Sequence, residues 1–282
     1  MDALALGSLG PLGRVAGTLA LRPYVFGFLA LYLVVGAAEW GWRRVSAFTV
    51  WAAAVAFAAE WTSTRVGVPF GLYHYTGVTA GRELYLGNVP LFDPVSFSFL
   101  AFASLGLARR LVAWRDGTSR TSDGVGAAAR PEGPRTAVVA GLLMMWLDLV
   151  IDPLAVRGDR WFLGRVFYYP EPGLYFGVPL SNFAGWVLVG GVIAGGWPAL
   201  ARRVGGQPSA WAGRLPGRRF HVLALYYVVL GFNLAVTAAV AEPALLAAGI
   251  LLHAPLAAVV VSSLRTAGCA DAVTRAALDH LT

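Results

Sequence analysis

The sequence predicts an all-α, polytopic membrane protein with about seven transmembrane helices. Of its 282 residues, 57% are hydrophobic and only 13% are charged, whereas a soluble domain usually carries about 25% charged residues. The apolar residues also occur in long blocks, and roughly 20 apolar residues suffice to span a bilayer as a helix. Together, these two observations exclude an ordinary soluble fold.

Each predicted span is an apolar block bounded by charged, Gly-rich or Pro-rich residues. The first block is the least regular, because Glu39 shortens its apolar run. No cleavable signal is expected before it, since Arg14 interrupts the only apolar stretch there. The predicted spans cover residues 24–41, 45–62, 91–109, 136–154, 180–200, 220–241 and 244–264.

The charge distribution predicts how the chain crosses the membrane. The net charge is +7, and every basic residue other than histidine is an arginine. The arginines gather in loops beside the predicted spans, a pattern typical of membrane topology and not of nucleic-acid binding. One set of loops carries about twice as many arginines as the other and is expected in the cytoplasm. We therefore expect an integral protein of the cytoplasmic membrane with its N-terminus outside.

The loops fall into two kinds. Residues 115–135 and 202–219 are rich in Gly, Ser and charge without apolar periodicity, so we expect flexible cytoplasmic loops there. No soluble domain is indicated, and residues 1–282 are expected to form a single membrane domain. The outer loops, residues 63–89 and 155–179, are rich in Tyr, Trp, Phe, Gly and Pro. Such loops are expected to fold back onto the bundle at the membrane interface.

The two outer loops also resemble each other. The stretches "LYLGNVPLFDPVSF" (84–97) and "LYFGVPLSNFAGW" (174–186) both give Leu-Tyr-x-Gly, then Val-Pro-Leu, then a polar residue where a span begins. We infer a weak internal repeat of parallel orientation. Independent origin of two similar turns stays an alternative, because the matching segments are short.

Two acidic residues stand at the outer end of the fourth predicted span. Asp148 and Asp152 are four residues apart, so they lie on the same helix face. Charged groups at membrane depth are costly and usually face the bundle interior or a wet cavity. Asp152 precedes Pro153, which marks the end of the span. Asp148 then lies one turn deeper with no cation nearby in the sequence, which favours a functional role.

Three further polar residues map to the same level of the membrane. Glu60 ends the second span, Asp93 begins the third, and Asn182 begins the fifth. The convergence of these helix ends predicts a pocket. Each residue also has a structural interpretation: Glu60 as the partner of Arg65, Asp93 as a helix N-cap, and Asn182 as a cap or an interhelical hydrogen-bonding group.

These residue types predict acid-catalysed carbocation chemistry on an isoprenoid. Two close carboxyl groups in a dry site cannot both ionise readily, so one is expected to be neutral and to act as a general acid. Aromatic faces nearby can stabilise a cation. No metal or phosphate-binding motif is present, so no metal or cofactor is expected. The expected catalytic residues are Asp148, Asp152 and Glu60, and the expected substrate-binding residues are Tyr73, Tyr75, Asp93, Trp146, Tyr175, Asn182 and Trp186.

Four stretches carry a resemblance to a known family. They are "EWTSTRVGVPFGLYHYT" (60–76), "LGNVPLFDPVSF" (86–97), "WLDLVIDPLAVRGDRWF" (146–162) and "YFGVPLSNFAGW" (175–186). In these stretches the sequence resembles the carotenoid biosynthesis protein family of membrane carotenoid 1,2-hydratases. Members include gamma-carotene 1',2'-hydratases and bisanhydrobacterioruberin hydratases. The similarity extends over about residues 24–264.

The resemblance implies addition of water to the terminal 1,2 double bond of an acyclic carotenoid, giving a tertiary alcohol without a redox cofactor. The implied partners are the acyclic carotenoid, water, membrane lipid and other enzymes of the carotenoid pathway. From the residues we expect Asp148, tuned by Asp152, to donate the proton, and Glu60 or Asn182 to position the water.

Two other functions stay open at this point. An intramembrane prenyltransferase or elongase acting on carotenoid precursors would need aspartate-rich motifs for Mg²⁺ and diphosphate, and "DLVID" (148–152) is a sparse candidate. A transporter or ligand-binding membrane protein would need a polar path across the bilayer. The acidic residues lie at one side only, which argues against an ion path.

Overall fold

The computed structural model confirms the all-α membrane fold. It describes residues 10–117, 133–162, 164–215 and 220–279. Within that part of the chain, seven helices are long and apolar enough to cross a membrane, and each overlaps one predicted span in the same order. They are α2 (Pro23–Trp40), α3 (Trp42–Val66), α4 (Phe92–Arg115), α5 (Pro134–Ala155), α6 (Leu180–Val204), α7 (His221–Ala239) and α8 (Pro243–Asp279), the last with its apolar part at Pro243–Thr266.

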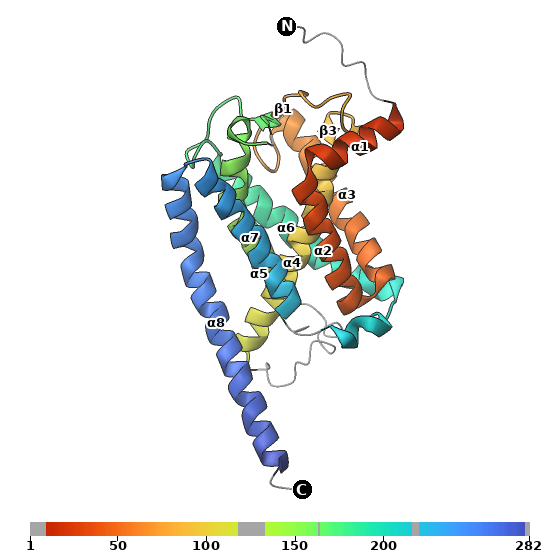
Figure 1. The fold of residues 1–282 in the computed structure, drawn as a ribbon, viewed down its shortest axis with the longest axis vertical. Helices are drawn as coiled ribbons and strands as arrows, with labels where there is room; N and C mark the ends of the chain where they lie inside the picture. Colours follow the sequence, from red (N-terminus) through yellow and green to blue (C-terminus); the bar gives the residue numbers. More distant parts are fainter. Residues whose placement is uncertain (1–9, 118–132, 163, 216–219, 280–282) are drawn as a thin grey trace.

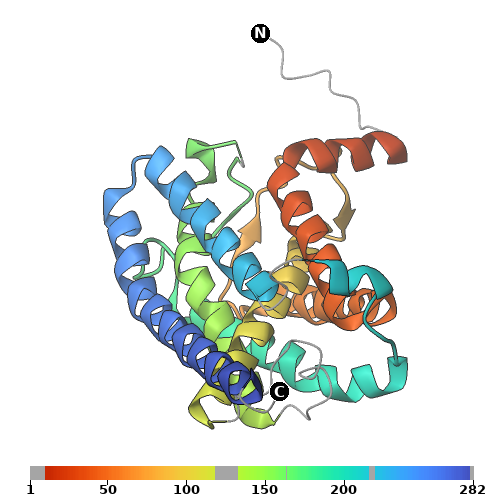
Figure 2. The same cartoon turned by 60° about the horizontal axis from the view of Figure 1, so that its bottom comes forward.

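The helices form one bundle in which α4 is the most buried span. It packs against α3, α5 and α7, so it lies at the centre (Figure 1). Helix α8 lies along the outside of the bundle in both ribbon views (Figures 1 and 2). This arrangement encloses the outer ends of α3, α4, α5 and α6, the four helices on which the sequence predicts a pocket.

Helices α5 and α6 approach each other very closely, because glycines line their contact. A Cβ added to Gly141 on α5 would lie 2.3 Å from the carbonyl oxygen of Val187 on α6. A Cβ added to Gly190 on α6 would lie 3.0 Å from the Cα of Gly141. Small residues allow such contacts in membranes, where helix association depends on close packing. The close contact holds the acidic end of α5 against the start of α6.

The two aromatic outer loops meet each other over the bundle. Strand β1 (His74–Tyr75) pairs antiparallel with β4 (Phe167–Tyr168), and β2 (Tyr85–Leu86) pairs antiparallel with β3 (Val89–Pro90). The backbone N–H of Thr76 adds a hydrogen bond of 2.8 Å to the carbonyl of Val166. The pairing joins loops that are about 90 residues apart in the chain, and it closes one end of the bundle. The internal repeat stays a prediction.

A short helix precedes the first span, and the sequence analysis did not predict it. Helix α1 (Pro11–Leu21) lies at an angle to α2, at the same end of the molecule as the strands (Figure 1). It is tied down by Thr18, whose buried hydroxyl accepts a 3.0 Å hydrogen bond from the N–H of Leu84. The chain turns between the two helices at Arg22, so that residue lies at the same end of the bundle as the strands.

The structure describes residues 202–215 of the second predicted flexible loop, and the flexibility of this loop stays a prediction. Helix α6 continues to Val204, and the short 3-10 helix η4 covers Ala210–Arg214. Both the N–H and the hydroxyl of Ser209 donate to the carbonyl of Ala37, at 3.2 and 2.9 Å. These contacts are tertiary, so local composition does not reveal them. Most of the other predicted flexible loop, residues 118–132, lies outside the described residues.

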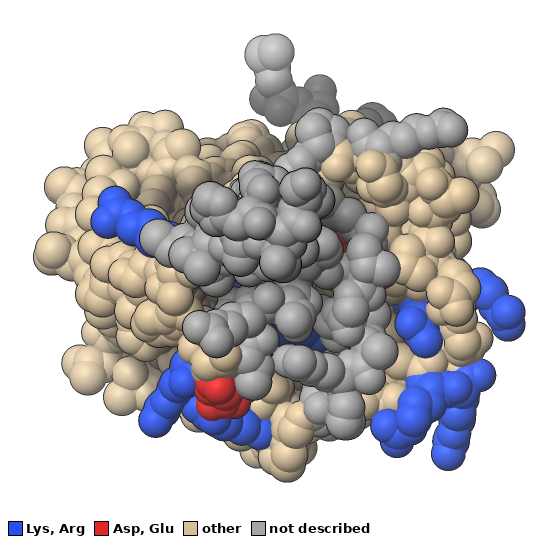
Figure 3. Space-filling model, turned by 90° about the horizontal axis from the view of Figure 1, so that it is seen from below, with Lys and Arg blue, Asp and Glu red and all other residues tan. Residues whose placement is uncertain are grey.

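Arginine side chains gather at the rim of the end opposite the strands, where few acidic side chains are visible (Figure 3). Exposed members include Arg43 at the start of α3 and Arg202 and Arg203 at the end of α6. An arginine-rich end is expected on the cytoplasmic side of a membrane. The placement of the N-terminus outside stays a prediction.

The α5–α6 contact gives a direct test of the packing. Gly141→Ala forces a methyl group against backbone and should destabilise the protein by about 1–3 kcal/mol, as overpacking usually does. Gly231→Ala on α7 is the matched control, since nothing lies within 4 Å of its added Cβ, and a small gain in helix propensity is expected there. Thermal unfolding in detergent measures both. If the two variants unfold at the same temperature, the close glycine contact does not determine the stability of the protein.

Candidate active site

A cavity of about 150 Å³ lies inside the bundle at the end that the aromatic loops cover. Helices α2 to α7 and both outer loops contribute to its wall. An apolar cavity of this size is large enough for a benzene-sized molecule. Three carboxyl groups line it, those of Glu60, Asp93 and Asp152, and Arg22 is the one cation among the described lining residues. The convergence of these polar helix ends on one cavity agrees with the predicted pocket.

Asp148 and Asp152 are joined by one amide group. The Nδ2 of Asn182 donates to Oδ2 of Asp148 at 2.7 Å and to Oδ2 of Asp152 at 2.8 Å. The indole N–H of Trp186 donates a longer bond of 3.3 Å to the same oxygen of Asp152. All donors to the two aspartates in these bonds are neutral. The pair therefore faces the bundle interior, and it is held by an amide and an indole.

The two aspartates differ in their access to the cavity. Asp152 lines the cavity, whereas Asp148 does not and is fully buried behind it. The Oδ1 of Asp148 has no hydrogen-bond partner in the described part of the chain. The helix also continues past Pro153 to Ala155, slightly further than the proline predicted. This order places Asp152, and not Asp148, beside any molecule in the cavity.

Local structure explains why these four side chains meet. Asp148 and Asp152 stand one turn apart on α5, and Asn182 and Trp186 stand one turn apart on α6. Residues four apart share a helix face, and the glycine contact brings the two faces together. Asn182 makes no cap hydrogen bond at the start of α6. Of the two structural interpretations, interhelical hydrogen bonding is therefore the one observed.

Glu60 accepts a hydrogen bond from a tyrosine and not from an arginine. The hydroxyl of Tyr75 on β1 donates to Oε2 of Glu60 at 3.1 Å. Burial raises the pKa of Tyr75, so its hydroxyl stays protonated and available as a donor. Arg65, which the sequence offered as a structural partner of Glu60, instead lies 3.3 Å from the centroid of the Trp61 ring. Tyr73 lines the same wall and packs edge-on against Tyr75.

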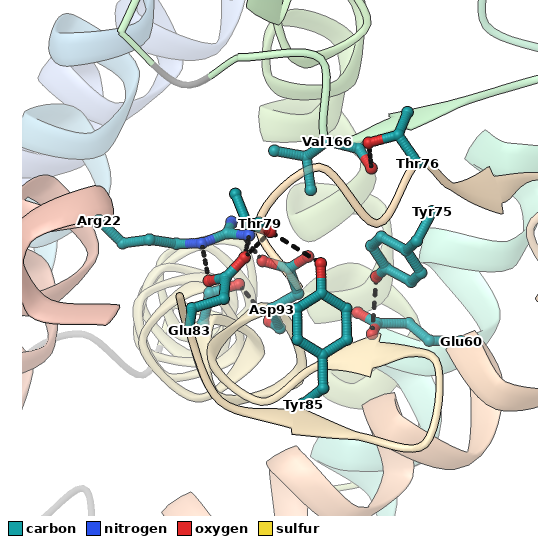
Figure 4. Close-up of polar contacts among 10 residues, drawn as sticks. Arg22, Glu60, Tyr75, Thr76, Thr79, Glu83, Tyr85, Asp93 and Val166 are labelled. Atoms are coloured by element: carbon teal, nitrogen blue, oxygen red, sulfur yellow. Dashed lines mark hydrogen bonds and ion pairs between the residues drawn. The ribbon is translucent and has the colours of Figure 1, made fainter. Parts of the chain in front are cut away.

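Asp93 belongs to a buried ion cluster with Arg22 and Glu83 (Figure 4). The guanidinium donates to Glu83 through Nε at 2.9 Å and Nη2 at 3.1 Å, and to Asp93 through Nη1 at 2.6 Å. The hydroxyl of Thr79 donates a short hydrogen bond to Glu83 and is also hydrogen-bonded to the hydroxyl of Tyr85. Burial opposes the charge on Arg22, but the two carboxylates outweigh it and raise the pKa of the guanidinium, so it stays a cation.

This cluster was not predicted from the sequence. Asp93 was interpreted as a cap or a substrate-binding residue, but its side chain makes no cap bond to α4. Arg22 counted only as a loop charge, and Glu83 was not singled out. Their contact joins residues 61 apart in the sequence. The sequence offered one signal for this cluster: Arg22 is a charged residue beside Pro23, at the boundary of an apolar block.

Aromatic side chains form most of the remaining wall. Phe97 and Trp186 stack with centroids 4.5 Å apart and planes at 8°. Tyr73 makes edge contacts with Phe167 and Tyr169, which come from the other outer loop. The aromatic lining residues are Tyr24, Phe28, Phe70, Tyr73, Tyr75, Phe97, Phe99, Trp161, Phe167, Tyr169 and Trp186.

Two of the predicted substrate-binding residues do not line the cavity. The indole N–H of Trp146 donates to the carbonyl of Leu252 at 3.1 Å, so this residue joins α5 to α8. Tyr175 packs edge-on against Phe183, outside the cavity. Trp146 faces away because it is two residues from Asp148, and such residues point to different sides of a helix. The other five predicted substrate-binding residues line the cavity, as do Glu60 and Asp152.

Comparisons with known proteins agree with this description. A family model described as "Carotenoid biosynthesis protein" matches residues 17–256. A curated protein of Haloarcula japonica, named bisanhydrobacterioruberin hydratase, is 32% identical over 184 residues, which cover 64% of this chain and 55% of the relative. The chain thus spans about half the length of that relative. No solved structure matches the chain.

The ion cluster gives a prediction for stability. Arg22→Gln leaves two carboxyl groups without their cation, and breaking a buried pair in this way usually costs about 3–5 kcal/mol. The double variant Arg22→Gln/Glu83→Gln removes one of the stranded charges and should recover part of the loss. Thermal unfolding in detergent reports both changes.

The matched control is Arg135→Gln. Arg135 pairs with Asp116 at 2.8 Å, but both side chains are more than 40% exposed, so about 0–1 kcal/mol is expected. Equal losses for Arg22→Gln and Arg135→Gln would show that the buried cluster does not hold α1 and the strands to the bundle.

Proposed function

The chain belongs to the carotenoid biosynthesis protein family, and on that premise we propose that it hydrates the terminal 1,2 double bond of an acyclic carotenoid to a tertiary alcohol. One observation carries the proposal: the carboxyl group of Asp152 lines an aromatic cavity, and Asn182 joins it to the buried carboxyl group of Asp148. The hydratase name of the relative from Haloarcula japonica supports the same reaction. The protein would act within the cytoplasmic membrane, where a carotenoid dissolves.

The dimensions of the cavity suit one end of such a substrate. About 150 Å³ is enough for a benzene-sized group, which is comparable to the branched tip of an isoprenoid. The rest of a long polyene would have to lie outside the cavity, among the apolar helices and lipid. The reaction therefore needs a substrate with an open, unsaturated end.

Asp152 is the proposed proton donor. Its carboxyl group lines the cavity, whereas Asp148 is buried behind it. The hydrogen-bond donors to the two carboxyl groups, Asn182 and Trp186, are neutral. A dry site does not stabilise two adjacent anions. The pair therefore holds one proton, and Asp148 acts as a positioning residue. This assignment reverses the roles that we expected from the sequence.

The reaction begins with transfer of the Asp152 proton to C2 of the terminal double bond. The π electrons of the C1=C2 bond form the new C2–H bond, which leaves a tertiary cation at C1. The hydrogen bond from Asn182 stabilises the carboxylate that remains. A water molecule then forms the C1–O bond and loses one proton to a base. Of the two residues expected to position the water, we assign Glu60, since the Asn182 amide already donates to both aspartates.

The aromatic wall stabilises the cation. Phe97 and Trp186 form a stacked pair in the cavity wall that Asp152 also lines. Tyr73, from the first outer loop, packs against Tyr169 of the second. A cation within about 6 Å of an aromatic face gains about 2 kcal/mol or more when the site is dry. The same rings leave little room for bulk water, which limits side reactions of the cation.

The donor assignment predicts a loss of activity. Asp152→Asn should lower hydration of an acyclic carotene by about 100-fold or more, because a positioned general acid usually contributes at least that factor. Expression in a lycopene-producing host, with H₂¹⁸O in the medium, measures the product by its gain of one labelled water. The control is Asp159→Asn, an exposed acid in the following loop, which should hydrate normally. Normal hydration by Asp152→Asn at equal protein level would eliminate Asp152 as the donor.

A further inference from the structure

The cavity holds its three carboxyl groups in two different ways. Asp152 and Glu60 accept hydrogen bonds from neutral groups, an amide, an indole and a phenol. Asp93 instead accepts from the guanidinium of Arg22 at 2.6 Å. A carboxyl group bound to a cation is stabilised as its anion. The cavity therefore presents one carboxyl group paired with a cation, Asp93, and two held by neutral donors, Asp152 and Glu60.

Asp93 also keeps access to the cavity. Its side chain is 20% exposed and lines the cavity, while the side chain of Glu83 is fully buried. The close-up shows Asp93 between the Arg22–Glu83 pair and the Glu60–Tyr75 pair (Figure 4). Asp93 and Glu60 thus face the same cavity.

The charge of the cluster keeps Asp93 reactive. Arg22 carries one positive charge, and it is shared by the two carboxylates of Glu83 and Asp93. The cluster therefore has a net charge of −1, so the guanidinium does not neutralise Asp93 completely. Glu83 accepts hydrogen bonds from Nε and Nη2, which fixes the guanidinium with its Nη1 donating to Asp93.

We propose that Asp93 is the base that takes the proton of the attacking water, and that Arg22 and Glu83 are positioning residues that keep it ionised and oriented. This assignment rests on the proposed hydratase function. The water oxygen forms the C1–O bond, its O–H bond breaks, and the proton moves to Asp93. Asp152 is then a carboxylate and Asp93 an acid. Transfer of that proton back to Asp152 through water in the emptied cavity restores both groups.

Separate acid and base residues predict a distinctive product pattern in D₂O. In Asp93→Asn, Asp152 still delivers a deuteron to C2, but capture of the cation by water is slow. The cation then returns a proton from C2 to Asp152, and the alkene re-forms with deuterium at C2. The expected result is an alcohol yield about 100-fold lower, with deuterium accumulating in the unhydrated carotenoid. Asp152→Asn should give neither product, because the first step needs its proton.

The positioning role of Glu83 has its own readout. Glu83→Gln should shift the ratio of deuterated alkene to alcohol toward the alkene, as Asp93→Asn does, and Glu83→Asp should restore the ratio in part. A purely structural defect would lower both products together and leave the ratio unchanged. Glu171→Gln, in an exposed loop, is the control and should match the wild type.

The experiment uses the full-length protein in membranes with an acyclic carotene in D₂O, and mass spectrometry reads both products. Absence of any alcohol with the wild type would overturn the proposed function itself. A wild type that hydrates, with Asp93→Asn forming alcohol at the same rate, would overturn only the assignment of Asp93. Equal loss of alcohol and of deuterated alkene in a correctly folded Asp93→Asn would also overturn it as the base.

Discussion

The bridge that Asn182 makes between Asp148 and Asp152 is the interaction on which the site depends. One amide group supplies both of its hydrogens to two carboxyl groups, at 2.7 and 2.8 Å. No cation takes part in these bonds, so the pair is electrostatically acceptable only when it shares a proton. The bridge also requires α5 and α6 to approach within the distance that Gly141 and Gly190 permit. A packing constraint between two helices thus sets the geometry of the bridge, and in the proposed mechanism the bridge sets the protonation of the site.

The irregular segments supply what the helices alone lack. The turn between α1 and α2 places Arg22 in the cavity wall. The loop before β2 brings Glu83 into contact with Arg22. Pairing of β1 with β4 holds Tyr75 over Glu60. Neutral donors hold the carboxyl groups at one wall and a guanidinium holds Asp93 at the other, so in the proposed reaction one small cavity offers both an acid and an anion. Hydration needs both, since one group gives a proton and another must receive one.

Hydropathy was sufficient to predict the seven spans, because each is a long, mostly apolar block with a polar boundary. The predicted pocket also followed from position alone, since Glu60, Asp93, Asp152 and Asn182 all mark helix ends on one side. Contacts between distant side chains gave no such signal. The bond from Arg22 to Glu83 spans 61 residues, and nothing periodic links them. Which of the two aspartates lines the cavity also depends on the rotation of α5 about its axis, and sequence spacing does not determine that rotation.

The most direct test of the shared proton is infrared difference spectroscopy on the purified protein at neutral pH. The spectrum of the wild type minus that of Asp152→Asn should contain the C=O stretch of a protonated carboxyl group, and this band should shift when H₂O is replaced by D₂O. Matched spectra of the Asp159→Asn variant should show no such band. A wild-type spectrum in which Asp152 contributes only carboxylate bands would contradict the account, because Asp152 would then hold no proton to donate.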